Sequence, residues 1–166
     1  SFDKKYILSF NLRADGSSKF MEGNRWGYFP SASFAWRIAK EKFMENVKAV
    51  SDLKLRLSYG TVGNNRINDY LYIQTFASNP YFYGINGQSV FGYSSNYLPN
   101  ELLKWETTVS KNIGLDLSLF NDRFGLTVDM YENKTKDLLL SVPIAPTYGY
   151  STQLQNVGQT KNRGIE

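Results

Sequence analysis

The chain has 166 residues and a net charge of +4, with 19 cations scattered among 15 acids, so it lacks the basic block typical of nucleic-acid binding. Cys and His are both absent, which excludes disulfides, thiol nucleophiles, Cys/His zinc sites and imidazole catalysis; we expect no catalytic residue, cofactor or metal site. Mean hydropathy is −0.41, and no apolar run approaches the roughly 18 residues of a transmembrane helix. A helical membrane protein is therefore excluded, whereas a soluble protein and a membrane β-barrel both stay open.

Apolar and polar residues alternate with a period of two, which predicts an all-β chain. In the first half, three predicted strands carry their apolar residues at Tyr6, Leu8, Phe10 and Leu12; at Trp26, Tyr28, Ala32, Phe34, Trp36 and Ile38; and at Leu53, Leu55, Leu57 and Tyr59. Pro30 interrupts the second strand and is expected near a strand end or bulge, where its missing N–H is tolerated.

Two further strands are predicted to form a hairpin. The fourth runs from Trp105 to Leu119 and the fifth from Phe124 to Tyr131, and Asn121-Asp122 between them tolerates the positive φ of a two-residue turn. This turn predicts four cross-strand pairs on the apolar face: Leu119–Phe124, Leu117–Leu126, Leu115–Val128 and Ile113–Met130. The polar face then holds Ser118–Gly125, Asp116–Thr127, Gly114–Asp129 and Asn112–Tyr131. A sixth strand is predicted to begin near Gln153 and to be cut off at Glu166. The predicted fold is thus an antiparallel meander of about six strands.

The connections between these strands alternate in length. Residues 14–25, 61–104 and 135–152 form long connections, whereas residues 39–51, with one predicted helical turn, and Asn121-Asp122 are short. Short turns on one side and long loops on the other are typical of bacterial outer-membrane barrels. A soluble β-sandwich also alternates apolar and polar residues, but it rarely carries a loop of more than about 40 residues.

Five segments resemble the barrel of SusC/RagA-type TonB-linked transporters. They are RADGSSKF (13–20), NRWGYFPSASFAWRI (24–38), SDLKLRLSYGTVGN (51–64), LKWETTVSKNIGLDLSLFNDRFGLTVDMYENKTKDLLL (103–140) and NVGQTKNRGIE (156–166). They occur in the family's order, on strands and loops that the alternation predicts independently. Residues 68–102 match no segment of the family.

The resemblance implies a plugged barrel of about 22 strands. It implies uptake of oligosaccharides or peptides across the Gram-negative outer membrane, with a SusD-type surface lipoprotein as lid and periplasmic TonB as energy source. The plug, the TonB box and the terminal strand are absent, so residues 1–166 are expected to be an internal piece of the barrel domain. We expect no enzymatic activity. The alternative hypothesis is a secreted β-sandwich adhesin or carbohydrate-binding module.

The resemblance favours lipid over a sandwich core as the environment of the apolar face, whose lipid-facing residues are predicted to be Leu115, Leu117, Leu119, Phe124, Leu126 and Val128. Lys111 interrupts this face. We favour a cation that snorkels to lipopolysaccharide phosphates at the membrane edge, and the alternative is a β-bulge between Val109 and Ile113. A lysine at the membrane midplane would cost about 2–4 kcal/mol.

The polar face is expected to line the lumen. Its candidate residues are Arg37, Lys54, Arg56, Asp116, Asp129 and Tyr131. One interpretation is that these charged residues contact substrate or the plug. We favour the other, in which they form a hydrated wall without a specific ligand. Asp116 and Asp129 lie on adjacent strands, as the paired carboxylates of a glycosidase would, but a hydrated wall gives no reason for an acid–base role.

Aromatic residues are concentrated between residues 70 and 105. Tyr and Trp rings offer an apolar face and a polar tip, which suits sugars or a partner protein. We name Tyr81, Tyr83, Tyr93 and Tyr97 as candidate extracellular contacts. The alternative, which we favour for most of these rings, is that they pack the loop into an ordered cap.

Overall fold

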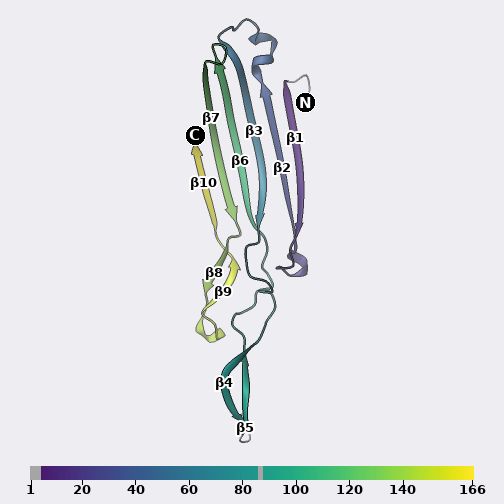
Figure 1. The fold of residues 1–166 in the computed structure, drawn as a ribbon, viewed down its shortest axis with the longest axis vertical. Helices are drawn as coiled ribbons and strands as arrows, with labels where there is room; N and C mark the ends of the chain where they lie inside the picture. Colours follow the sequence, from purple (N-terminus) through teal and green to yellow (C-terminus); the bar gives the residue numbers. More distant parts are fainter. Residues whose placement is uncertain (1–4, 86–87) are drawn as a thin grey trace.

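The computed structural model describes residues 5–85 and 88–166, with the side chains of residues 79–90 outside that description. Its main feature is an antiparallel sheet of six strands in the order β1-β2-β3-β6-β7-β10 (Figure 1). These strands are β1 (Tyr6–Gly16), β2 (Trp26–Arg37), β3 (Val50–Asn64), β6 (Glu106–Leu119), β7 (Phe124–Lys136) and β10 (Gln159–Ile165). The antiparallel six-stranded meander predicted from the alternation is thus confirmed.

The predicted register of the β6–β7 hairpin is also confirmed. All eight of these pairs are present, from Leu119 opposite Phe124 to Asn112 opposite Tyr131. Asn121 and Asp122 have φ of 57° and 63°, the left-handed conformation that such a turn needs. Phe120 also has a positive φ, of 54°, and its N–H donates to the carbonyl oxygen of Ala49 on the neighbouring connection.

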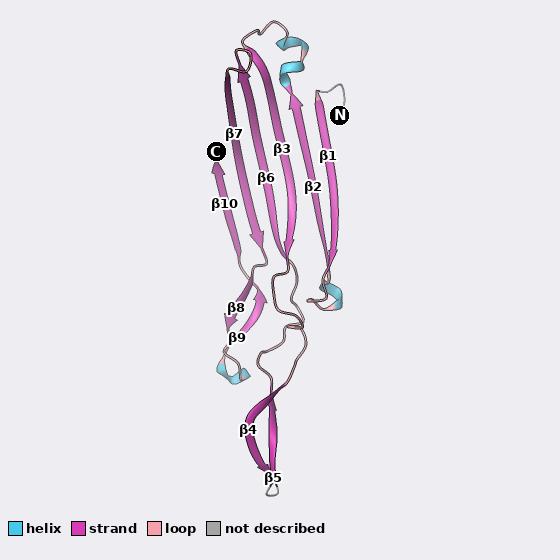
Figure 2. Cartoon of the chain, viewed as in Figure 1, coloured by secondary structure: helices cyan, strands magenta, loops and turns pink. Residues whose placement is uncertain are grey.

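Short and long connections leave opposite ends of the sheet (Figure 2). One end, which we call the short-turn end, holds residues 120–123 and the 3-10 turns η2 (Ile38–Lys40) and η3 (Lys42–Met44), where a helical turn was predicted. The opposite, long-loop end holds η1 (Glu22–Asn24) and the segments that lead to two further hairpins and η4 (Pro146–Tyr148). The strands extend further into the long connections than the alternation predicted. Their ends lie beyond the apolar band, where apolar and polar residues no longer alternate regularly, so the sequence pattern does not reveal them.

Two of the three long connections, residues 61–104 and 135–152, contain strands of their own, contrary to their description as loops. β4 (Ala77–Ile85) pairs with β5 (Gln88–Ser94), and β8 (Leu139–Pro143) pairs with β9 (Thr152–Asn156). The predicted sixth strand from Gln153 was therefore wrong in its first part: residues 152–156 pair with β8, and only β10 joins the main sheet. Gly158, with φ of 78°, lies between β9 and β10.

The main sheet is a single layer. Among the described residues, the only buried apolar side chains are Phe20, Phe29 and Leu103, and they lie at the long-loop end. Leu8 and Phe10 in the middle of β1 are 73 % and 72 % exposed. Because no second sheet covers the apolar face in the described part of the chain, the β-sandwich alternative is not supported. No helix in the described residues is long and apolar enough to cross a membrane.

Candidate functional site: a two-faced sheet with an ordered loop end

The apolar face of the sheet is chemically uniform across all six strands in one row and across five strands in the next. The cross-strand ladder places one row of apolar side chains from β1 to β10: Leu8, Phe34, Leu57, Ile113, Met130 and Ile165. The next row toward the short-turn end contains Tyr6, Trp36, Leu55, Leu115 and Val128. All six residues predicted to face lipid lie on this face, since each pairs with another apolar residue of the same set.

The apolar band is staggered along the strands. On β1 it runs from Tyr6 to Leu12, and on β7 from Phe124 to Met130. The ladder sets Tyr6 level with Val128, so the band shifts by about four residues over four strand-to-strand steps. One residue per step, at about 3.3 Å rise and 4.8 Å strand spacing, corresponds to strands tilted by about 35° from the normal of the band. Transmembrane barrels have strand tilts of about 35–45°.

Lys111 marks the end of the band on β6. The ladder is continuous from Leu119 to Glu106 on both sides of β6, and its only register shift lies between Val50 and Asp52. The alternative of a β-bulge between Val109 and Ile113 was therefore wrong. Lys111 instead stays on the apolar face, opposite Tyr59 on one side and Glu132 on the other, one step beyond Ile113.

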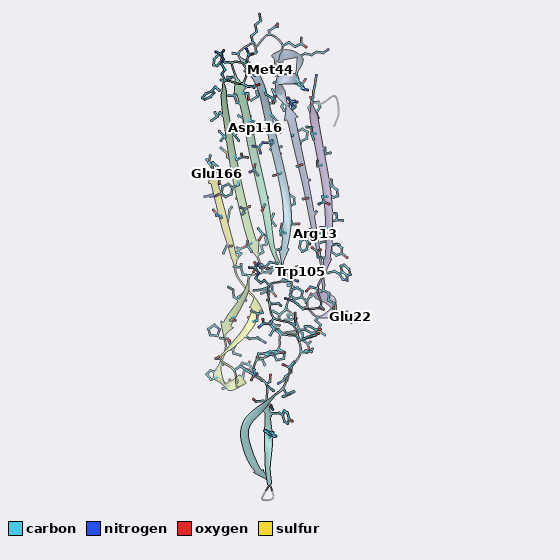
Figure 3. The ribbon with its side chains drawn as sticks, viewed as in Figure 1. Arg13, Glu22, Met44, Trp105, Asp116 and Glu166 are labelled. Atoms are coloured by element: carbon cyan, nitrogen blue, oxygen red, sulfur yellow. The ribbon has the colours of Figure 1, made fainter. Side chains whose placement is uncertain are left out.

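The polar face carries a connected charge network near the short-turn end. Arg56 donates from Nε and Nη2 to the two carboxylate oxygens of Asp116 at 2.8 and 2.9 Å, and Nη2 also donates to Asp129 at 2.9 Å. Asp116 additionally accepts from Thr127 at 3.3 Å and lies 3.9 Å from the Lys54 ammonium. Figure 3 shows Asp116 in the half of the sheet near the short turns.

A glycine provides the space for this network. Gly114 lies between Arg56 and Asp129 in the ladder, and a Cβ there would come within 2.7 Å of the Arg56 guanidinium and would also collide with Asp129. Asp116 and Asp129 therefore face one shared arginine rather than an open space between them. This arrangement gives no support to the paired-carboxylate hypothesis, because a glycosidase needs both groups free to face a sugar.

The other predicted lumen residues are placed as follows. Arg37 donates to Asp52 at 3.1 Å, and its cross-strand partner is Lys54. The Tyr131 ring lies over Gly164 of β10, where a Cβ would be only 2.8 Å from the hydroxyl oxygen. The structure thus brings Lys54, Arg56, Asp116 and Asp129 together, whereas Arg37 and Tyr131 lie in separate pairs.

Uncharged polar side chains occupy the polar face beyond the network. Two successive rows of the ladder contain Ser9, Ser33, Ser58, Asn112 and Tyr131, followed by Asn11, Ser31, Gly60, Ser110, Asn133 and Asn162. Thr108 and Thr135 follow, with their hydroxyl oxygens 2.9 Å apart. Hydroxyl and amide groups both donate and accept hydrogen bonds, so this part of the face suits neutral polar ligands and water.

An aromatic cluster closes the long-loop end of the polar face. The Trp105 ring lies 5.5 Å from both Phe20 and Phe29, and its Nε1 donates to the carbonyl oxygen of Arg25 at 3.0 Å. Phe20 and Leu103 are fully buried. Figure 3 shows Trp105 where the strands meet the long loops. The alternation of apolar and polar residues does not reveal this cluster, because Phe29 is an apolar residue at a polar-face position.

A cavity of about 550 Å³ lies beside this cluster. Its wall includes Asn11, Arg13 and Asp15 of β1, together with Phe29 and Trp105. The Arg13 guanidinium is 2.7 Å from Asp15, and Arg13 is exposed. The cavity thus combines aromatic rings with paired charges and amides, which is the mixture found in sites that bind polar organic molecules.

The long connections are held to one another by hydrogen bonds. The Asn156 side chain accepts from the backbone N–H of Lys104 and donates to its carbonyl oxygen, both at 2.9 Å. Asn100 donates to the carbonyl oxygen of Leu154, and Gln153 donates to that of Pro99, both at 2.8 Å. A cleft of about 350 Å³ lies between these segments.

The four candidate tyrosines have different surroundings. Tyr93 on β5 is 71 % exposed and is free to meet a ligand. The Tyr97 hydroxyl contacts Thr75 and the carbonyl oxygens of Tyr70 and Ile73 at 2.9 to 3.2 Å, so it serves packing within its own connection. Tyr81 and Tyr83 belong to β4, but their side chains lie outside the described part of the structure.

Glu41 is a hydrogen-bonding centre at the short-turn end. Its carboxylate accepts from the Tyr6 hydroxyl at 2.6 Å and from Trp36 Nε1 at 3.1 Å, and the Lys5 ammonium lies 3.5 Å away. The hydrogen bonds from Tyr6 and then Trp36, with a smaller contribution from Lys5, hold the pKa of Glu41 below its ordinary value.

Within the described residues, no group of three or more acidic side chains is arranged to hold a metal ion.

Comparison with known proteins agrees with this two-faced sheet. The family described as "TonB dependent receptor-like, beta-barrel" matches residues 1–166. TonB-dependent receptor SusC of Bacteroides thetaiotaomicron is 40 % identical over 165 residues, covering 98 % of this chain and 16 % of that protein. TonB-dependent receptor P39 of Formosa agariphila is 42 % identical over 166 residues, covering 99 % of this chain and 15 % of that protein.

Solved structures give the same result. The structure of the RagAB peptide transporter aligns with a TM-score of 0.86 and 36 % identity over 99 % of this chain and 18 % of that chain. The siderophore receptor PirA of Pseudomonas aeruginosa aligns with a TM-score of 0.60 at 16 % identity, which shows a common fold only.

The sheet is therefore of the TonB-dependent receptor β-barrel class, whose members are outer-membrane proteins of Gram-negative bacteria. This chain belongs to that family, and its similarity to SusC and to the RagAB transporter is consistent with the SusC/RagA type. It spans about one sixth of the length of the curated relatives that it matches.

Proposed function

We propose that residues 1–166 are part of the wall and the extracellular loops of an outer-membrane barrel that actively imports large nutrients. The observation that carries this proposal is the staggered apolar band, with uniform apolar pairs on one face and polar groups on the other. In this assignment the band lies in lipid and the polar face lines the lumen. Lipid then covers the apolar face, which would be unfavourable in water. Barrel closure pairs the two open edges of the sheet with further strands.

The orientation follows from the connections. Outer-membrane barrels have short turns on the periplasmic side and long loops outside the cell. The turn at residues 120–123 and the 3-10 turns between β2 and β3 are accordingly assigned to the periplasmic side. The aromatic cluster around Trp105 and the hairpins β4–β5 and β8–β9 are assigned to the extracellular side, where substrate is first met.

The transport cycle is inferred from the relatives. The neighbours include the receptor SusC and the RagAB peptide transporter. By analogy, the full-length protein takes up oligosaccharides or peptides, is covered by a SusD-type surface lipoprotein, and is driven by periplasmic TonB. The uncharged polar rows and the cavity beside Trp105 supply hydrogen-bonding groups and ring faces that suit either substrate class.

Transport rather than catalysis is favoured by the polar face itself. Asp116 and Asp129 are both hydrogen-bonded by Arg56, so they act as anchors of a charge network. The ion pairs in this part of the polar face, those of the network and the separate Arg37–Asp52 pair, balance three cations against three carboxylates: Arg37, Lys54 and Arg56 against Asp52, Asp116 and Asp129. Because these charged groups pair with one another, the wall has little net charge that could trap a passing substrate. A surface along which substrate moves requires such weak binding.

The test uses a strain that lacks the full-length gene. We expect it to lose growth on the cognate oligosaccharide or peptide and to lose accumulation of labelled substrate, with recovery on complementation. The complemented strain should lose accumulation again when TonB is deleted. Parallel cultures on defined glycans and on peptides separate the two substrate classes. Unchanged accumulation of both kinds of nutrient in the deletion strain would overturn the proposal.

A further inference from the structure

The outward face of β6, β7 and β10 holds an open groove of about 620 Å³ at the edge of the apolar band. Its apolar floor is formed by Ile113, Met130 and Ile165, which follow one another in a single row of the ladder. The next row toward the long-loop end contributes Lys111, Glu132 and Arg163 to the same groove. The groove therefore joins an apolar surface to charged groups within one step of the ladder.

Cations predominate at the charged end of the groove and beyond it. Five lie on this face in the three rows past the band, against the single carboxylate of Glu132: Lys111, Lys134, Lys136, Lys161 and Arg163. Lys161 lies 2.7 Å from Glu132 and so neutralises that carboxylate. The remaining four cations are an excess of positive charge on the three strands.

The register makes this excess unfavourable unless an anion is present. Lys134 and Lys161 are direct cross-strand partners, and like charges in that position destabilise a sheet. Lys111 and Arg163 flank Glu132 from the two neighbouring strands, in the same row. A phosphate above this row would accept hydrogen bonds from both and relieve the repulsion.

The other half of the sheet differs. Just beyond the band, β2 presents Trp26 and Tyr28, which are 63 % and 65 % exposed, and β1 presents Ala14. These are the amphipathic rings of an ordinary interfacial girdle. The cationic rows are thus confined to β6, β7 and β10 and are not a general feature of the band edge.

We propose that the groove on β6, β7 and β10 is a binding site for a phosphorylated glycolipid of the outer leaflet. The acyl chain lies on Ile113, Met130 and Ile165, and the phosphate is held by Lys111 and Arg163, with Lys134 and Lys136 beyond. This inference rests on the proposed membrane placement and orientation, which put the cations at the outer-leaflet headgroups.

The test uses the purified, delipidated full-length protein in detergent, with native mass spectrometry as the readout. The probes are bisphosphorylated lipid A and the same lipid A after enzymatic removal of its phosphates. We expect wild-type protein to prefer the phosphorylated lipid. The double variant Lys111→Gln/Arg163→Gln should weaken binding of that lipid about tenfold, since two charged hydrogen-bond donors are lost, and should leave binding of the dephosphorylated lipid unchanged.

The double variant Lys42→Gln/Lys48→Gln is the matched control, because it removes the same charge at the short-turn end. It should bind like wild type. Lys134→Gln/Lys136→Gln, which should weaken binding less, provides a second variant if the first does not assemble. Equal wild-type binding of the two lipids, or variants that keep the preference, would overturn the site. Heat-modifiable gel mobility reports barrel assembly separately: an assembled barrel without the preference rejects only this inference, whereas a full-length protein that is soluble without detergent rejects the membrane placement.

Discussion

The side-chain amide of Asn156 forms two hydrogen bonds with the backbone of Lys104, one to its N–H and one to its carbonyl oxygen. The amide thereby forms the two hydrogen bonds that the backbone of a neighbouring β-strand residue would form. It joins the end of β9 to the start of β6 across 52 residues of sequence. The same Nδ2 also donates to the carbonyl oxygen of Asp137 at 2.9 Å. One amide thus holds together the places where both long connections leave the sheet.

Replacing Asn156 by Ala should loosen the long-loop end without affecting the barrel wall. Three hydrogen bonds are lost, each worth about 1 kcal/mol, and the backbone groups of Lys104 turn to water. In the full-length protein we expect faster amide hydrogen exchange in residues 98–104 and 137–143, with strands β6 and β7 unchanged. Asn162→Ala on β10, an exposed amide of the main sheet, is the control. Equal exchange in the two variants would mean that other contacts hold these segments.

Gly114→Ala should disrupt the charge network on the polar face. The added methyl group meets Asp129 and the Arg56 guanidinium, and overpacking of this kind costs about 1–3 kcal/mol. Gly125→Ala is a matched control on the facing strand β7, because a Cβ there has no atom within 4 Å. We expect the temperature of the heat-modifiable gel shift to fall for Gly114→Ala and to stay the same or rise slightly for Gly125→Ala. Equal behaviour of the two variants would show that Arg56 has room to move aside.

The stabilising effect of Glu41 should depend on pH. Its pKa is lower in the folded state than in the unfolded state, so its contribution is complete above the ordinary glutamate value of about 4.3 and is lost as the pH falls through the folded pKa. Glu41→Gln should therefore destabilise the full-length barrel at pH 7, and the difference from wild type should shrink as the pH falls below about 4. Gel-shift temperatures at several pH values measure this. Glu45→Gln, an exposed carboxylate of the same connection, is the control, and a pH-independent difference would contradict the argument.

The isolated 166-residue chain should not behave as a soluble domain. Leu8 and Phe10 are more than 70 % exposed, and β1 and β10 present open edges to further strands. We expect aggregation in water, recovery of dispersed material in detergent, and no cooperative thermal transition by circular dichroism. A soluble monomer with a sharp transition would favour the sandwich module over the barrel wall.

The wall of this sheet was predictable from the sequence because lipid and lumen impose a period of two. A shift of one residue would move Leu115 and Leu117 to the polar face, so the alternation together with the Asn121-Asp122 turn determined the register. The edge of the band at Lys111 was predictable for the same reason. The pairing of residues 152–156 with β8, rather than with the main sheet, was not predictable, since alternation does not show which of two possible partners a strand takes.

The long-loop end was less predictable for physical reasons. Strands β4 and β8 lie beyond the apolar band, so no lipid face imposes alternation on them. Phe29 occupies a polar-face position, and the signal that was missed is the pair Gly27 and Gly63, where a Cβ would collide with its ring. The hydrogen bonds of Asn156 are to backbone groups of Lys104, which are distant in sequence. Local sequence patterns do not predict such a contact.

The β4–β5 hairpin provides the sharpest test of extracellular function. Ala77 and Ser94 are cross-strand partners at its base, so their Cα atoms are about 5 Å apart and a short linker can replace everything between them. Removing the whole segment 68–102, in contrast, would also remove Asn100 and Pro99, which bond to β9. Deletion of residues 78–93 with a Gly-Ser linker should therefore leave the barrel wall intact, because it removes no band residue and changes loop-closure entropy by only about 0.6 kcal/mol per halving of length.

We expect the hairpin deletion to assemble normally by heat-modifiable mobility and to reduce substrate accumulation or co-purification of the surface lipoprotein. Tyr93→Ala, with Tyr81→Ala and Tyr83→Ala in the same gene, should have a smaller effect of the same kind, since it removes ring faces but keeps the backbone. Tyr97→Ala is a contrasting variant: its hydroxyl bonds within the connection, so it should alter hydrogen exchange there before it alters binding. Normal uptake and normal lipoprotein binding after the deletion would reduce the hairpin to a passive cap, and lost assembly would mean that residues 78–93 take part in barrel formation.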